Sequence, residues 1–222
     1  IKAIDNCWFT SFPGLMSTRV RNYYTNKMET AKGHLKLQRQ HVQSTKPSSM
    51  QPRKSSHRIS THIIEPKNQF SVDMTGRYPI TSKQGNKYIL VMIDWDSNYI
   101  KLIPLKSRKS NSIITAYNDA YNWFKTHGFQ ASVLKLGNEV SKLLIDTIIA
   151  DGLDYQLASP NDHRQNPAER AIQDVKAHFI SVRSITDKSF PLNGWDLLLQ
   201  YTEDTLNMLR PSKLNPKVSA YT

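Results

Sequence analysis

Two carboxylates and one Gly-Asn pair mark the positions where this chain could do chemistry. Asp73 ends a short apolar run, Gly137-Asn138 follows another, and Glu169 lies near the start of a long helical pattern. Mg²⁺ takes a few carboxylates, waters and substrate phosphates as ligands, so converging acidic oxygens could hold a pair of these ions. Such a pair stabilises the attacking and leaving oxygens of phosphoryl transfer. These positions can act together only if the fold gathers them.

The chain after residue 66 is predicted to form one α/β unit. Apolar runs and turn signals predict strands at 70–73, 88–93, 99–105, 133–136 and 153–157. Periodic apolar positions predict helices at 110–127, 139–150, 167–184 and 195–209. The stripe of Ile113, Tyr117, Tyr121 and Phe124 is interpreted as core rather than interface.

This order, βββαβαβαα, predicts a mixed five-stranded sheet with helices on its faces, as in the ribonuclease-H-like fold. Strands one and four are neighbours in that topology, and the long helix crosses beside their ends. Asp73, Gly137 and Glu169 are therefore expected at one edge of the sheet. Asp94 and Asp96 lie at a hairpin turn, where Asp is an ordinary turn former.

The N-terminal part of the chain is more basic than the rest. The 222 residues include 30 Lys+Arg and 18 Asp+Glu, a formal net charge of +12, of which residues 1–66 carry +8. Residues 1–42 are predicted to be partly helical, with a helix at about 29–42 anchored by Leu35, Leu37 and Val42. Residues 43–66, rich in Ser, Pro and basic residues, are predicted to be a flexible linker ahead of the unit at 67–222.

Composition excludes several classes of protein. One cysteine, Cys7, excludes an internal disulfide framework, and no apolar run is long enough for a membrane span. A basic arm fits a polyanion, most simply nucleic acid, or else a solvated linker without a target; composition favours neither. Because the chain begins with Ile1, we expect a fragment or a processed piece of a longer product.

Residues 67–222 resemble the catalytic core of retroviral and retrotransposon integrases, most closely the integrase segment of LTR-retrotransposon polyproteins. Asp73, in Val72-Asp73-Met74-Thr75-Gly76, matches the first catalytic Asp, and Glu169, in Asn166-Pro167-Ala168-Glu169-Arg170, matches the catalytic Glu. Further matches are YILVMID at 88–94 continuing into Ser97, Trp195-Asp196, Asn207 and Leu214-Asn215-Pro216. The segments Phe12-Pro13-Gly14-Leu15 and Ala31-Lys32-Gly33-His34-Leu35 also resemble sequences upstream of such cores.

One departure from the family concerns the metal site. The family has Asp-Asn at the end of the fourth strand, where this chain has Gly137-Asn138, and glycine supplies no ligand. Glu139 could replace it if the strand continued, but we favour Glu139 as a cap or first-turn acid of the next helix. The resemblance implies Mg²⁺ or Mn²⁺ as cofactor, with Asp73 and Glu169 as metal ligands and catalysis weak or lost.

The resemblance also implies a DNA-binding surface around the long helix. Glu169, Gln173 and Lys176 share one stripe of that helix, and the last two are candidate DNA contacts. Arg164, Gln165 and Arg170 are further candidates, the arginines through bidentate phosphate binding. A solvated helix face explains these residues equally well.

Zinc is not expected, because His34, His41, His57 and His62 have no Cys pair after them, and Cys7 precedes them all.

We therefore predict an integrase-like core whose ancestor joined a DNA 3′-hydroxyl to a target phosphodiester. The rival interpretation is a non-enzymatic DNA-binding or assembly module derived from such a core. A ribonuclease H is disfavoured, because the helix at 110–127 contains no Glu and only Asp119 as an acid. The resemblance implies DNA as partner, a homodimer or higher oligomer, and action in the nucleus or a cytoplasmic particle.

Overall fold

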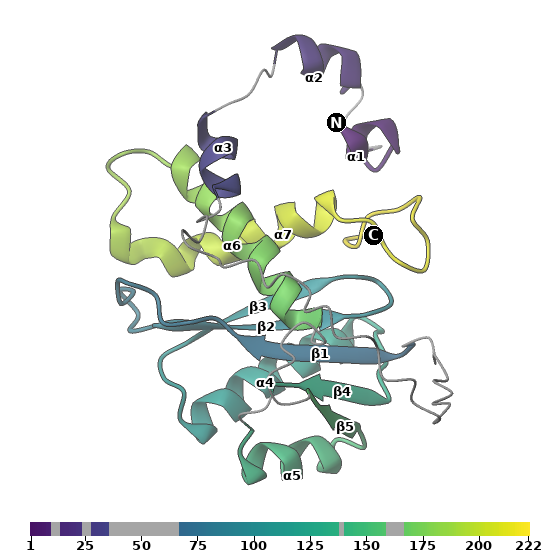
Figure 1. Ribbon diagram of the computed structural model, residues 1–222, viewed down its shortest axis with the longest axis vertical. Coiled ribbons are helices and arrows are strands. Elements are labelled where there is room, and N and C mark those ends of the chain that lie inside the picture. The colour runs from purple at the N-terminus through teal and green to yellow at the C-terminus, as the bar shows by residue number, and fades with distance from the viewer. Residues whose placement is uncertain (10–13, 24–27, 36–66, 138–139, 159–166) are drawn as a thin grey trace, which may run out of the picture.

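The computed structural model describes residues 1–9, 14–23, 28–35, 67–137, 140–158 and 167–222 (Figure 1). Three short helices come first: α1 (Lys2–Asp5), α2 (Ser17–Tyr23) and α3 (Met28–His34). The strands are β1 (Gln69–Met74), β2 (Tyr88–Asp94), β3 (Ile100–Leu105), β4 (Val133–Leu136) and β5 (Asp154–Leu157). The other helices are α4 (Ser110–Thr126), α5 (Lys142–Ala150), α6 (Pro167–Ile185), the 3₁₀ helix η2 (Leu192–Leu198) and α7 (Leu199–Leu209).

The five strands form one mixed sheet in the order β3-β2-β1-β4-β5. The pairs β1–β2 and β2–β3 are antiparallel, while β1–β4 and β4–β5 are parallel. The chain passes from β3 to β4 through α4, and the parallel neighbours β4 and β5 are joined by a crossover through α5. The predicted fold class, with strands one and four as neighbours, is confirmed.

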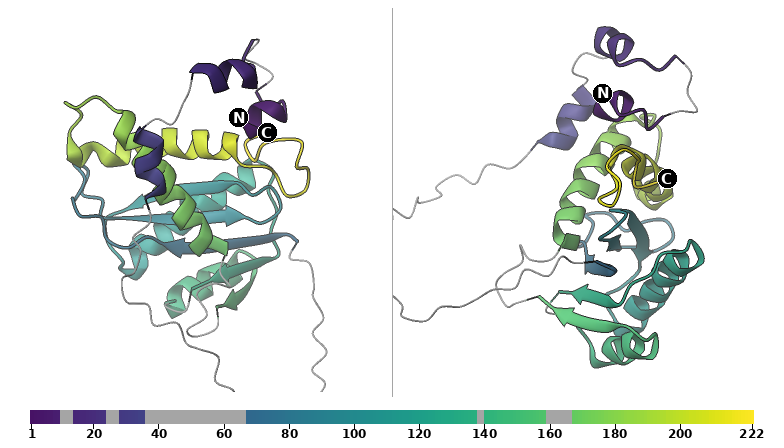
Figure 2. Two further views of the ribbon diagram at one scale, coloured as in Figure 1. Left: turned by 45° about the horizontal axis from the view of Figure 1, so that its top comes forward. Right: turned by 90° about the vertical axis from the view of Figure 1, so that its right-hand side faces the viewer.

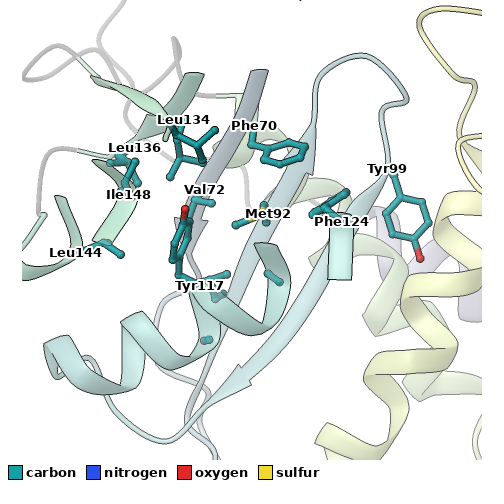
Figure 3. Close-up of a cluster of buried hydrophobic side chains, with 14 of the residues drawn as sticks. Phe70, Val72, Met92, Tyr99, Tyr117, Phe124, Leu134, Leu136, Leu144 and Ile148 are labelled. Carbon is teal, nitrogen blue, oxygen red and sulfur yellow. The ribbon is translucent and has the colours of Figure 1, made fainter. Parts of the chain in front are cut away.

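Helices cover the two faces of the sheet (Figures 1 and 2). On one face α4 and α5 bury Phe70, Val72, Leu134 and Leu136 (Figure 3). On the other face α6, η2 and α7 cover residues that include Ile89, Val91, Ile93, Ile100 and Leu102. The predicted α4 stripe is core, because Tyr117 and Phe124 are fully buried and Ile113 and Tyr121 pack against the same cluster.

Two helices that pack on the sheet differ from the sequence-based expectation. Helix α5 begins at Lys142 rather than 139, because the side chain of Ser141 caps it by accepting a hydrogen bond from Leu144 N at 3.3 Å. Glu139, expected as a cap or first-turn acid of this helix, lies outside the described residues. The helix expected at 195–209 is instead η2 followed by α7, with a tighter first segment.

The N-terminal helix predicted at 29–42 is also shorter. It ends at His34, and Leu35, expected to be an anchor, is 78% exposed. The part of that prediction from 36 to 42 and the predicted linker at 43–66 lie outside the described residues. Among the described helices, none is long and apolar enough to cross a membrane.

Helix α3 packs against α6 through a glycine (Figure 1). Gly33 is buried, and a Cβ atom placed there would overlap Ser181 Oγ and the carbonyl oxygen of Ala177. A seven-residue helix is marginal alone, so this close approach explains why α3 forms where it does. Gly33 is the point of attachment between α3 and the core.

Two side chains of α7 occupy the outer edge of β3. Glu203 is buried, and its carboxylate accepts hydrogen bonds from Lys101 Nζ at 2.7 Å, Tyr99 Oη at 3.1 Å and Leu102 N at 2.8 Å. Asn207, one turn later, accepts from Ile100 N at 2.9 Å and donates to Ile100 O at 2.8 Å. Unpaired edge groups invite pairing with other chains; here α7 satisfies them.

The ion pair between Glu203 and Lys101 is almost completely shielded from solvent. The two side chains are 1% and 9% exposed, and burial raises the pKa of the Glu203 carboxyl against the opposing effect of the Lys101 ammonium. Removing one partner of such a pair leaves a buried charge without compensation.

We predict that Glu203→Ala lowers the free energy of unfolding by about 3–5 kcal/mol, because Lys101 is left charged and buried. The measurement is urea unfolding followed by tryptophan fluorescence. The double variant Glu203→Ala/Lys101→Met should recover part of the loss. A Glu203→Ala loss below about 1 kcal/mol, the range of exposed pairs, would contradict this account of the β3 edge.

Candidate functional site

The ends of β1 and β4 lie side by side and bring Asp73 next to Gly137. The parallel register pairs Val72 with Leu136, so the next residue of each strand lies at the same level. A Cβ atom placed on Gly137 would lie 3.7 Å from Asp73 Oδ1, an ordinary contact distance. The predicted proximity of these two positions is confirmed.

Side chains alternate between the two faces of the sheet along each strand, and this places Asp73 and Gly137 on one particular face. Phe70 and Val72 belong to the cluster under α4 and α5, so Asp73 lies on the opposite face, the one that α6 covers. Its carboxylate is half-buried, and Oδ1 accepts a hydrogen bond from Met74 N at 2.7 Å.

Glu169 lies in the first turn of α6. Its neighbours Ala168, Ala171 and Ile172 are buried against the sheet, and α6 packs on β1 and β2. The Glu169 side chain itself is half-buried. Glu169 and Asp73 are thus on the same side of the sheet, as predicted. The catalytic roles of Asp73, Glu169 and the Gly137 position stay predictions.

The described residues do not fit a two-metal site. No group of three or more His, Cys, Asp or Glu side chains within the described ranges could hold a metal ion. Asp73 and Glu169 offer carboxylates, but Gly137 offers no ligand. Glu139, the possible substitute, lies outside the described residues, and so do His41, His57 and His62 of the zinc prediction.

Two other acids near β2 have structural partners instead. Asp94 Oδ2 accepts a hydrogen bond from Ser97 N at 2.7 Å, and Asp96 Oδ2 accepts one from Asn68 N at 2.8 Å. Both carboxylates stabilise the turn after β2. The interpretation of Asp94 and Asp96 as turn residues is confirmed.

The predicted DNA-binding stripe of α6 is open to solvent. Gln173 and Lys176 are exposed. Arg170 is exposed too and makes a long ion pair, 3.8 Å, with Asp174. Asp174 makes its shorter contact, 2.8 Å, with Arg210. Arg164 and Gln165 lie outside the described residues. The DNA contacts of all five candidates stay predictions.

Sequence reasoning missed a cation beside the carboxylates. Lys135 of β4 is half-buried, lies opposite Ser71 of β1 and, two residues before Gly137, shares its face. Ser71 Oγ is buried there and has no hydrogen-bond partner among the described residues. The alternation of β4, with Leu134 and Leu136 in the core, was the signal that could have identified Lys135.

A second missed cation is Arg108. It donates a hydrogen bond from Nη2 to Thr75 O at 3.2 Å, just beyond the end of β1. Its guanidinium also lies over the ring of Tyr88, 5.2 Å from the centroid. Arg108 follows β3 by only three residues, but nothing in its local sequence indicates this position near Asp73.

Two of the solved structures with a similar fold are retroviral. One match is to a chain of the cryo-EM structure of the simian T-cell lymphotropic virus intasome in complex with PP2A regulatory subunit B56 gamma, with a TM-score of 0.54 and 17% identity. It covers 72% of this chain and 56% of that one. Another is the crystal structure of the catalytic core domain of BIV integrase, with a TM-score of 0.51 and 13% identity over 70% and 92% of the two chains. The chain has an integrase catalytic-core-like fold.

At these identities the likeness establishes the fold of the chain and not its activity. This integrase-like chain spans little more than half of the matched intasome chain. No protein-family model and no curated protein matches it. The resemblance to integrase cores is therefore confirmed at the level of the fold.

We predict opposite outcomes for two glycine-to-alanine substitutions. Gly137→Ala should leave the melting temperature nearly unchanged, because its Cβ finds only an ordinary contact. Gly33→Ala should detach α3 from α6, because its Cβ would overlap Ser181 and Ala177. Thermal unfolding measures the first effect, and hydrogen exchange of residues 28–34 measures the second. Slow exchange at 28–34 in Gly33→Ala would contradict the close approach of α3.

Proposed function

We propose that this chain is an integrase-like core of LTR-retrotransposon origin that binds DNA and lacks strand-transfer activity. The observation that carries the proposal is the position of Gly137. A Cβ atom placed on it would lie 3.7 Å from Asp73 Oδ1. A carboxylate at this position would complete an acidic cluster with Asp73 and Glu169. Strands β1 and β4 keep their parallel register up to this position, so we attribute the deficiency to the missing side chain.

The ancestral reaction is the attack of a DNA 3′-hydroxyl on a phosphodiester, with divalent metal. A metal pair there needs acidic ligands from several elements. The described residues supply Asp73 from β1 and Glu169 from α6, and none from the end of β4. We therefore assign no catalytic step to this chain.

DNA binding draws support from charge and from the placement of cations. The net charge of +12 favours a polyanion. Lys135 lies on the same side of the sheet as Asp73, and Arg170, Gln173 and Lys176 are exposed on α6. These side chains form a surface suited to phosphate contacts, which dominate DNA affinity. As parts of the same proposal, the chain self-associates through its core and acts in the nucleus.

We predict that affinity for duplex DNA falls steeply with salt, because binding releases counterions. Lys176→Ala and Lys135→Ala should each weaken binding and reduce the slope of log K against log salt by about 1. Fluorescence anisotropy over a salt series measures this. The matched control is Lys188→Ala, because Lys188 is exposed and follows the C-terminal end of α6. Equal slopes for all four proteins would contradict this binding surface.

We predict that strand transfer on short DNA duplexes with Mg²⁺ or Mn²⁺ is absent from this chain and appears in Gly137→Asp, because the variant adds the missing carboxylate beside Asp73. Gly137→Asn, similar in size but uncharged, should stay inactive, and so should Gly137→Asp/Glu169→Gln. Activity in the unsubstituted chain that Glu169→Gln abolishes would contradict the proposed loss of catalysis. DNA binding without activity in any variant would favour the rival binding module.

A further inference from the structure

The two edge strands of the sheet differ in whether side chains bind their outward backbone groups. At β3 the side chains of Glu203 and Asn207 bind the backbone groups of Ile100 and Leu102. At β5, the opposite edge, no described side chain does the same. An edge strand without such cover is a template for an added strand.

The outward groups of β5 can be assigned from its ladder. Asp154 N donates to Ser132 O and Ala158 N donates to Leu136 O, both at 2.9 Å, so these residues direct their N–H groups toward β4. By alternation, Tyr155 and Leu157 direct their N–H and C=O groups outward. No hydrogen bond joins these outward groups to any part of the chain that the structure describes.

Apolar side chains surround this open edge. Tyr155 and Leu157 are 41% and 43% exposed, and Ile149 at the end of α5 is 56% exposed. A hollow of about 560 Å³ beside the start of β5 is lined by Ile149, Gly152, Leu153, Asp154 and Tyr155. An added strand would place alternate side chains over this hollow.

Charge indicates which occupant fits. Residues 143–158 contain Asp146, Asp151 and Asp154 and neither Lys nor Arg, although the whole chain carries +12. All three aspartates are exposed. This acidic edge disfavours pairing with the same edge of a second copy. It attracts a basic segment.

We propose that β5 is a docking edge for an extended, basic peptide segment of a partner protein, which adds to the sheet as a sixth strand. Main-chain hydrogen bonds to Tyr155 and Leu157 would supply affinity, and alternate apolar side chains over the hollow would supply specificity. Lysine or arginine side chains would face Asp154. The short strand limits the number of bonds, so this is a weak, reversible site. It is independent of the DNA-binding proposal.

The test uses a blocked, fluorescein-labelled peptide of alternating lysine and valine residues, with a glutamate-valine peptide as its counterpart. Leu157→Pro removes one outward N–H while sparing the ladder to β4, because proline is tolerated at an edge facing solvent. It should weaken binding of the lysine peptide about tenfold, because a carbonyl oxygen of the bound peptide loses its hydrogen-bond donor. Leu157→Ala, which keeps the N–H, should weaken binding by much less.

A second variant keeps the proposal testable if Leu157→Pro fails to fold. Asp154→Lys should weaken binding of the lysine peptide and strengthen binding of the glutamate peptide. Hydrogen exchange with bound peptide should show protection at residues 154–158. Equal affinity for both peptides, or protection elsewhere, would overturn the proposal. So would a concentration-dependent dimer abolished by Leu157→Pro, because a second copy would then occupy the edge.

Discussion

The parallel pairing of β1 with β4 is the constraint on which the site depends. It requires the crossover through α4, and it buries Phe70, Val72, Leu134 and Leu136 on one face. Because side chains alternate, the same register leaves Asp73, Gly137 and Lys135 together on the other face. A slip of one residue would reverse both faces at once. Core packing and site geometry are therefore consequences of one register.

The rest of the molecule separates into surfaces of different chemistry. Helices α6 and α7 cover the face that carries the site, and the buried network of Glu203, Lys101 and Asn207 fixes α7 at the β3 edge. Exposed cations lie on α6, whereas residues 143–158 at the other edge are acidic and apolar. Under the two proposals, one domain binds DNA through the first surface and a basic peptide through the second.

Strong periodic patterns made most of this fold predictable. The sheet could be predicted from the apolar run of β2, the stripe of α4 and the order of the elements. The proximity of Asp73 and Gly137 could be predicted from the positions where β1 and β4 end. Effects that depend on distant partners were not predictable. Gly33 lies in a helix because that helix packs closely on Ser181 and Ala177 of α6. The polar residues Glu203 and Asn207 are buried because they form hydrogen bonds with the backbone of the edge strand β3. Lys135 lies before the end of β4, and only the alternation of that strand places it on the face of Gly137.

The most direct test of the central claim is anomalous diffraction from crystals of the unsubstituted protein and of Gly137→Asp, both soaked in Mn²⁺. Our account predicts a manganese peak beside Asp73 in the variant and none there in the unsubstituted protein, because glycine supplies no ligand. A peak of equal height beside Asp73 in both proteins would contradict it. Another side chain would then complete the metal site, and the chain would have to be regarded as a competent integrase core.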